Sequence, residues 1–112
     1  MNVTIEQQGD TTVVRPEGRL DFGASAGFQD QLCAAIAGGS KPPAKVVIDA
    51  SALEYVSSAG LRAFLVGARN AKNSGTALAI CALVPTVREV FQVSGFDRLV
   101  PVKETLSEAM AS

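Results

Sequence analysis

Two adjacent serines, Ser57 and Ser58, stand where the sequence changes from a strand-like to a helical pattern. Residues 46–48 are an unbroken run of β-branched side chains, which is typical of a parallel strand covered on both faces. From Leu61 onward, apolar residues recur at the spacing of an α-helix. The pattern therefore predicts a strand, a loop over residues 50–56 and a helix, with hydroxyl groups where the helix begins.

A serine hydroxyl at the start of a helix can do one of two things. It can cap the helix by accepting a hydrogen bond from a free N–H of the first turn. If Ser57 is the cap, the hydroxyl of Ser58 is left at the exposed helix start, next to Gly60, whose missing side chain leaves room for a close approach. A phosphate on Ser58 then meets free N–H groups and the positive end of the helix dipole. It also adds about 1.5 to 2 negative charges to any surface that a partner contacts.

Several kinds of catalytic site are excluded by composition. The sequence has no histidine, which removes Ser-His-Asp and Cys-His catalysis and the commonest metal ligand. Cys33 and Cys81 match no CxxC pattern, and we expect both to be reduced thiols buried in the core. The segment 38–41, Gly-Gly-Ser-Lys, follows a predicted helix and is interpreted as a linker. We therefore expect no enzymatic activity, no cofactor and no metal.

Length and charge set broader limits. We expect the 112 residues to form a single domain over 1–112, with one hydrophobic core. The net charge of −1 argues against nucleic acid as the main partner, because binding to a phosphate backbone needs a basic surface. No apolar run approaches the length of a transmembrane helix, and no signal peptide is visible. We expect a cytoplasmic protein that does not insert into membranes.

The chain before the two serines predicts a hairpin and a helix. Strands are expected over 3–5 and 12–20, and Pro16 should bend the second strand or leave it unpaired on one side. Either Asp21 or Ser25 can cap the helix that follows. Its apolar stripe consists of Phe28, Leu32, Ala35 and Ile36.

The chain after the serines alternates between strand and helix. The helix that begins at the serines should end near Asn73, and an apolar strand follows over 76–82. The next helix begins at Pro85, and a short strand is expected at Leu99 and Val100. A capping box from Thr105 to Glu108 starts a final helix. The residues expected to turn inward from the helix after Pro85 are Val87, Val90 and Phe91.

The alternation of elements predicts an α/β fold. It indicates a mixed, mostly parallel sheet of four or five strands, flanked by about four helices and joined by right-handed crossovers. The core is expected to contain Val46, Val47, Ile48, Leu61, Phe64, Leu65, Leu78 and Ile80.

The central motif resembles that of STAS domains, found in bacterial anti-sigma-factor antagonists. The matching segments are Val-Val-Ile-Asp-Ala-Ser at 46–51 and Tyr-Val-Ser-Ser-Ala-Gly-Leu-Arg at 55–62. Shorter matches lie in the same order along the chain, at 18–21, Gly75, 90–91 and 94–96. The resemblance extends over essentially the whole chain.

The resemblance implies a STAS-type sheet and a role in partner switching. In this family the unphosphorylated protein binds an anti-sigma factor that is also a serine kinase, and so releases a sigma factor for transcription. The kinase uses ATP to phosphorylate a serine at the helix start, and a serine phosphatase restores the active form. The acceptor aligns with Ser58; Ser57 stands where many phosphorylated members have Asp and is the alternative acceptor. The implied partner-binding residues are Asp21, Ser57, Ser58, Ala59, Gly60 and Arg62.

Two other functions stay open at this point. The chain could be a STAS adaptor that is not phosphorylated and belongs to another assembly, such as a lipid-transport complex or a stress-signalling scaffold. It could also be a small enzyme or nucleotide-binding domain that uses the crevice at the strand ends. The missing histidines and the missing phosphate-binding loop weigh against this last alternative.

Overall fold

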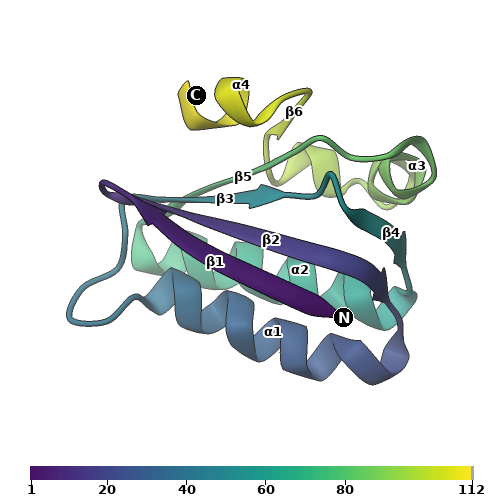
Figure 1. Ribbon diagram of the computed structural model, residues 1–112, viewed down its shortest axis with the longest axis horizontal. Coiled ribbons are helices and arrows are strands. Elements are labelled where there is room, and N and C mark those ends of the chain that lie inside the picture. The colour runs from purple at the N-terminus through teal and green to yellow at the C-terminus, as the bar shows by residue number, and fades with distance from the viewer. Residues whose placement is uncertain (112) are drawn as a thin grey trace.

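A mixed six-stranded sheet forms the centre of the computed structural model, which describes residues 1–111 (Figure 1). Its strands are β1 (Asn2–Gln8), β2 (Thr11–Leu20), β3 (Lys45–Asp49), β4 (Leu53–Val56), β5 (Ala77–Cys81) and β6 (Val102–Lys103). They lie in the order β1-β2-β3-β5-β6, and β4 pairs with the end of β2. The pair β1 and β2 is antiparallel, whereas the other pairs are parallel. The predicted mixed, mostly parallel α/β fold is therefore confirmed.

Helices cover both faces of this sheet. They are α1 (Phe22–Ala37), α2 (Ser58–Ser74), α3 (Pro85–Val93) and α4 (Leu106–Ala111), with a short 3-10 helix, η1, at Phe96–Arg98. Helices α1 and α2 pack side by side on one face, and α4 covers β3 and β5 from the other (Figure 1). Within residues 1–111, no helix has the length and apolar character that a membrane crossing requires.

The main core lies between the sheet and helices α1, α2 and α3. On this face Val46 and Ile48 of β3 and Ile80 of β5 are fully buried, as the β-branched run of β3 predicts. Phe64 of α2 lies in the middle of an aromatic cluster, with its ring centroid 5.0 Å from that of Phe28 and 5.2 Å from that of Phe91. Leu61 and Leu65, expected in the core, are only partly buried against it. The core therefore fixes α2 through one face and leaves its neighbouring side chains at the surface.

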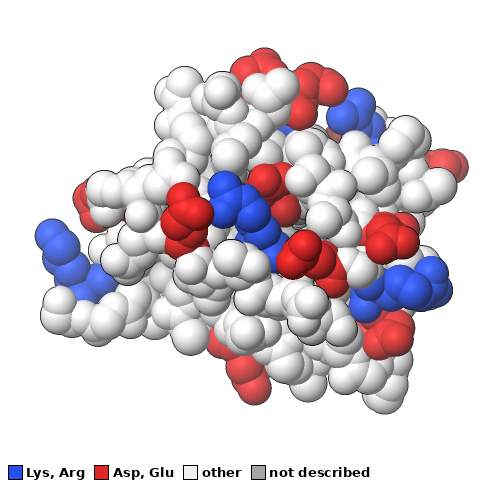
Figure 2. All heavy atoms as spheres, viewed as in Figure 1, with Lys and Arg blue, Asp and Glu red and all other residues white. Residues whose placement is uncertain are grey.

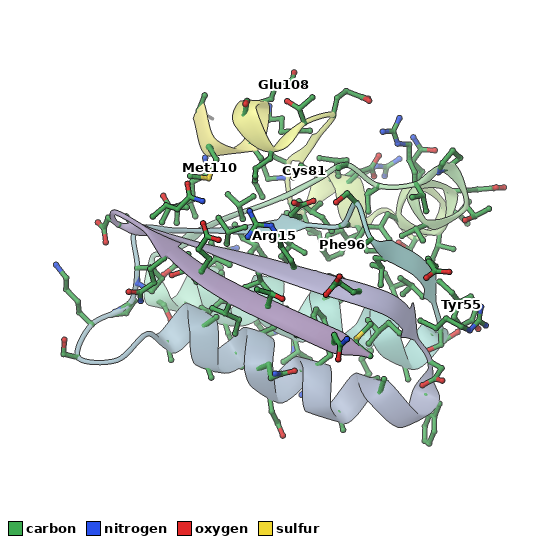
Figure 3. The ribbon with its side chains drawn as sticks, viewed as in Figure 1. Arg15, Tyr55, Cys81, Phe96, Glu108 and Met110 are labelled. Atoms are coloured by element: carbon green, nitrogen blue, oxygen red, sulfur yellow. The ribbon has the colours of Figure 1, made fainter. Side chains whose placement is uncertain are left out.

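A second, smaller core lies under α4. It contains Val47, Ala79, Cys81 and Ala109, with Met110 packed at its edge (Figure 3). Burial raises the pKa of the Cys81 thiol to about 11, and the nearby carboxylate of Asp49 adds to this rise. Cys81 is thus a protonated core thiol, as expected.

The other cysteine differs from its prediction. Both thiols are free, but Cys33 is only half-buried between α1 and α2. Its sulfur accepts a hydrogen bond from the side-chain amide of Asn70, 3.1 Å away. The apolar stripe of α1 is narrow, so a residue beside the stripe keeps part of its surface in solvent.

Three predicted segments are corrected by the structure. The expected loop over 50–56 contains β4, whose end residues are buried and whose two middle residues are exposed, so the strand shows no alternation. The last strand is Val102–Lys103, whereas Leu99 follows η1 and is 66% exposed. Val90, expected to turn inward, is 36% exposed, because Val87 and Phe91 already fill the inner face of α3.

Strand β2 changes its partner in the middle, at Pro16. It pairs with β3 as far as Val14 and with β4 from Gly18 onward. Pro16 lies between the two pairings, because it has no N–H to donate, and faces Val3 of β1 on the other side. The prediction of a strand that is unpaired on one side is confirmed. The change of partner brings the end of β2 next to β4, and so next to the start of α2.

Candidate functional site

The first turns of α1 and α2 lie at the same end of the sheet, on the right in Figure 1. One backbone hydrogen bond connects them: the N–H of Ser57 donates to the carbonyl oxygen of Leu20, 2.9 Å away. Asp21 therefore comes directly after Leu20, which is hydrogen-bonded to Ser57, the residue that caps α2. Two segments that are far apart in the sequence thus meet where β2 and β4 end.

Both helix starts have a side-chain cap. The carboxylate of Asp21 accepts a hydrogen bond from the N–H of Ala24 at 2.9 Å, and the hydroxyl of Ser57 accepts one from Gly60 at 3.1 Å. Ser25 is not a cap, because its hydroxyl donates to the carbonyl oxygen of Phe22. The cap of α1 is therefore Asp21 and not Ser25, and the cap of α2 is Ser57.

Ser58 is the first residue of α2 and its side chain is exposed. Two N–H groups at the start of α2 are satisfied by Ser57. Its hydroxyl accepts a hydrogen bond from the N–H of Gly60, and its carbonyl oxygen accepts one from the N–H of Leu61. Within residues 1–111, the N–H groups of Ser58 and Ala59 have no acceptor. The first turn carries no acidic side chain. The first turn of α2 therefore offers free donors to an added anion and contributes no negative charge of its own.

Gly60 serves a packing role within the chain. A Cβ at this position would lie 2.7 Å from Cγ of Leu20 and 2.9 Å from the carbonyl oxygen of Leu20. The space left by the missing side chain is filled by β2 of the same molecule, and Gly60 is buried. The room for a close approach that the sequence suggested is used for helix-to-strand packing.

Arg62 lies one helical turn after Ser58, and both residues are exposed. They line a shallow groove of about 450 Å³ along α2, together with Leu61, Leu65, Val66 and Arg69. The guanidinium of Arg62 has no ion-pair partner within residues 1–111. Ala59 is half-buried beside them. The structure thus places Asp21, Ser57, Ser58 and Arg62 on one end of the molecule.

Exposed apolar side chains near this end were missed by the sequence reasoning. Phe22 and Val93 are each 82% exposed, and Tyr55 is 40% exposed beneath the guanidinium of Arg19, which lies 4.2 Å from the ring centroid (Figure 3). Phe22 and Val93 fall outside the buried stripes of their helices, and this is the sequence signal that could have revealed them.

A second shallow groove, of about 380 Å³, connects two of these features. It runs between α2 and α3 and is lined by Leu61, Val90 and Val93. Leu61 also lines the groove that contains Ser58, so the two grooves share a wall. Exposed apolar surface of this kind is typical of protein interaction sites.

Charged side chains of both signs are interspersed on the face shown in Figure 2. The guanidinium of Arg15, on the outer face of β2, bonds Glu6 at 3.2 Å and Asp49 at 3.3 Å. This face therefore carries no extended basic surface of the kind that nucleic acid binding requires. Within residues 1–111, no group of three or more potential ligand residues could hold a metal ion.

Comparison with known proteins identifies the family. The family model for the STAS domain matches residues 2–109. BtrV of Bordetella bronchiseptica, named as a candidate anti-sigma factor antagonist, is 31% identical over 112 residues, which cover 100% of this chain and 94% of BtrV.

Two solved structures extend the comparison. The anti-sigma factor antagonist SpoIIAA, in its unphosphorylated form, is 25% identical with a TM-score of 0.80, covering 97% of this chain and 93% of that one. A glutamate-for-serine variant of RsbS from Moorella thermoacetica is 27% identical with a TM-score of 0.81, covering 99% and 93%. The chain therefore belongs to the STAS domain family and is a relative of the bacterial anti-sigma factor antagonists.

Proposed function

We propose that this chain is an anti-sigma factor antagonist that works by partner switching. In its unphosphorylated form it binds an anti-sigma factor that is also a serine kinase. Phosphorylation of Ser58 ends the binding, and a serine phosphatase restores it. The protein acts in the cytoplasm as a regulator of sigma-factor-dependent transcription and has no catalytic activity of its own.

The observation that carries this proposal is the division of roles between the two serines. Ser57 is held by its cap to Gly60, whereas the hydroxyl of Ser58 is exposed and free for a kinase. A phosphate on Ser58 can accept hydrogen bonds from the free N–H groups of Ser58 and Ala59, and it lies one turn from Arg62. The fold therefore tolerates the added charge at this position.

The surroundings of Ser58 support the proposal that phosphorylation ends partner binding. The apolar residues Phe22, Tyr55 and Val93 and the groove along α3 offer a surface that a protein partner can bury. A hydrated dianion in such a contact is costly to desolvate, so binding should weaken. Among the relatives, SpoIIAA is known in an unphosphorylated and in a phosphorylated form. Partner contacts are proposed for Asp21, Ser57, Ser58, Ala59 and Arg62. Gly60 is buried against Leu20, so its proposed part is to hold the helix start in place.

The experiment is phosphorylation by candidate serine-kinase anti-sigma factors of the native host. Purified protein is incubated with each kinase and ATP, and the phosphate is located by mass spectrometry. We expect label on Ser58 in the wild type and in Ser57→Ala, and none in Ser58→Ala. Label confined to Ser57 would reverse the roles of the two serines.

Binding to the same kinase is measured in parallel by calorimetry. Ser58→Ala should bind like the wild type, and Ser58→Asp should lose part of the affinity, because it carries one charge in place of two. The melting temperature of the phosphorylated protein should be unchanged or slightly higher. Tight binding of a partner with no label on either serine would instead indicate a STAS adaptor that is not controlled by phosphorylation.

A further inference from the structure

Another groove lies along the C-terminal half of α2. It has a volume of about 660 Å³ and is bounded by the C-terminal half of α2, the start of β5 and the residues around η1. Its apolar lining comes from Leu65, Leu78, Leu99 and Val100. Ala68, in the middle of the α2 wall, is ten residues beyond Ser58, or about 15 Å along the helix. The centre of this groove is thus well separated from Ser58, although Leu65 and Arg69 line both this groove and the one that contains Ser58.

Three cations, Arg69, Lys72 and Arg98, line this groove, and all three are exposed. None of them has an ion-pair partner within residues 1–111, whereas Arg15 and Arg88 are both paired. The described lining of the groove includes no acidic residue. Positive charge is therefore gathered around an apolar groove whose lining carries no negative charge to balance it.

The C-terminal end of α2 also borders the groove, and its dipole opposes an anion. That dipole corresponds to roughly half a negative charge, and the last carbonyls already accept hydrogen bonds from the N–H of Gly75. Three full positive charges outweigh it. The hydroxyl of Thr76 is already in use, because it donates to the carbonyl of Pro43 at 3.0 Å. The charged recognition at this site thus comes from the two arginines and the lysine.

We propose that this groove binds a small amphiphilic anion, with one carboxylate or phosphate group on an apolar body. A volume of about 660 Å³ matches the usual size of small-molecule sites. The leucine and valine side chains would cover the apolar body of the ligand. Arg69 and Arg98 would bind the anionic group, since a guanidinium matches the geometry of carboxylate and phosphate oxygens. Binding does not depend on the role proposed for Ser58.

Two fluorescent probes with nearly the same apolar body test the proposal. 8-Anilinonaphthalene-1-sulfonate carries one negative charge, and N-phenyl-1-naphthylamine lacks it. Titration of the folded full-length protein should show saturable binding of the sulfonate, at least about fivefold tighter than that of the neutral probe, the size expected for a charge-assisted contact. Octyl phosphate should displace the sulfonate, whereas octanol or inorganic phosphate at the same concentration should not.

Matched variants locate the site. Arg69→Gln and Arg98→Gln should each weaken sulfonate binding about three- to tenfold and change binding of the neutral probe less than about twofold. Leu99→Ala should weaken the binding of both probes. This variant should fold normally, because Leu99 is 66% exposed. Lys41→Gln, which removes the same charge elsewhere, and Val93→Ser, on the other apolar surface, should leave both affinities unchanged.

Three results would overturn the proposal. They are the absence of saturable binding, equal affinity for the charged and neutral probes, and wild-type sulfonate affinity in Arg98→Gln. Arg98 decides the location, because Arg69 also lines the groove that contains Ser58. Loss of binding in Val93→Ser would assign the probe to the surface near Ser58 and would equally contradict it. The phosphorylation and partner-binding assays use only the wild type and the serine variants, so a failure of probe binding leaves the proposed function standing.

Discussion

The hydroxyls of Ser57 and Ser58 belong to neighbouring residues but have different surroundings. That of Ser57 accepts a hydrogen bond from Gly60, and that of Ser58 projects from the first turn of α2. The difference arises because a capping residue has extended backbone angles, here φ −79° and ψ 171° for Ser57. One residue later the chain is helical, and the side chain turns outward.

Substitution of the two serines by alanine separates these roles. Ser57→Ala should lower the free energy of unfolding by about 0.5–2 kcal/mol, because it removes the cap. Ser58→Ala should change it by less than about 0.5 kcal/mol, as for other exposed positions. Urea denaturation of both variants measures the difference. A larger loss for Ser58→Ala than for Ser57→Ala would contradict the assignment of the cap.

Gly60 provides a second test at the scale of one residue. Gly60→Ala should lower the free energy of unfolding by about 1–3 kcal/mol, because the new methyl group would overlap Leu20. Gly27→Ala is the matched control, since a Cβ there meets no atom within 4 Å. That change should raise stability by about 0.4–1 kcal/mol. Equal effects of the two substitutions in denaturant melts would show that Gly60 is not packed as described.

Helix α2 connects the partner surface to the core. Its buried side chains are Ala63, Phe64 and Ala71, with Gly60 and Gly67 where the backbone comes close to neighbouring elements. Its exposed side carries Ser58, Arg62 and Arg69 along the grooves already described. A helix held firmly on one face can present charged groups in a constant position on the other.

Two phenylalanines test how α2 is anchored. Phe64→Ala should lower the free energy of unfolding by about 3–5 kcal/mol, because the ring is fully buried between Phe28 and Phe91. Phe22→Ala removes the same side chain from a position that is 82% exposed and should change stability by less than about 0.5 kcal/mol. Guanidinium melts of both variants provide the comparison. A loss below about 1 kcal/mol for Phe64→Ala would be inconsistent with this placement of the helix.

At the scale of the whole molecule, residues 1–111 form two hydrophobic cores of unequal size on opposite faces of one sheet. The larger core anchors α1, α2 and α3, and the smaller one holds α4 against β3 and β5. Both proposed surfaces lie on the side of the larger core. A change of charge at Ser58 is therefore separated from α4 by the sheet itself.

Cysteine reactivity reports on the smaller core. Only the thiolate reacts with disulfide reagents, and a pKa of about 11 leaves about one Cys81 thiol in a thousand ionised at pH 8. Raising the pH toward 11 increases the ionised fraction, but reaction also requires α4 to move away. We expect Ellman's reagent to modify half-buried Cys33 first and Cys81 only as the protein unfolds. Rapid modification of the single thiol in Cys33→Ser would contradict the packing of α4.

Sequence reasoning succeeded where structure depends on local order in the chain. The start of α2 at Ser58 and its end before Gly75 follow from apolar spacing and from the residues that suit helix ends. The strand at residues 46–48 follows from its β-branched run. The fold class follows in turn, because the alternation of strands and helices permits few topologies.

Tertiary structure alone decided which residues face solvent and which segments meet. Strand β4 shows no periodic pattern and exists because the end of β2 offers it free backbone groups after Pro16. Val90 is exposed because other side chains fill the space beneath α3. Asp21 lies near Ser57 because its neighbour Leu20 accepts a hydrogen bond from the N–H of Ser57, a residue 37 positions further along the chain. Apolar spacing and capping residues act over a few positions of the chain, whereas these contacts depend on how distant segments pack together.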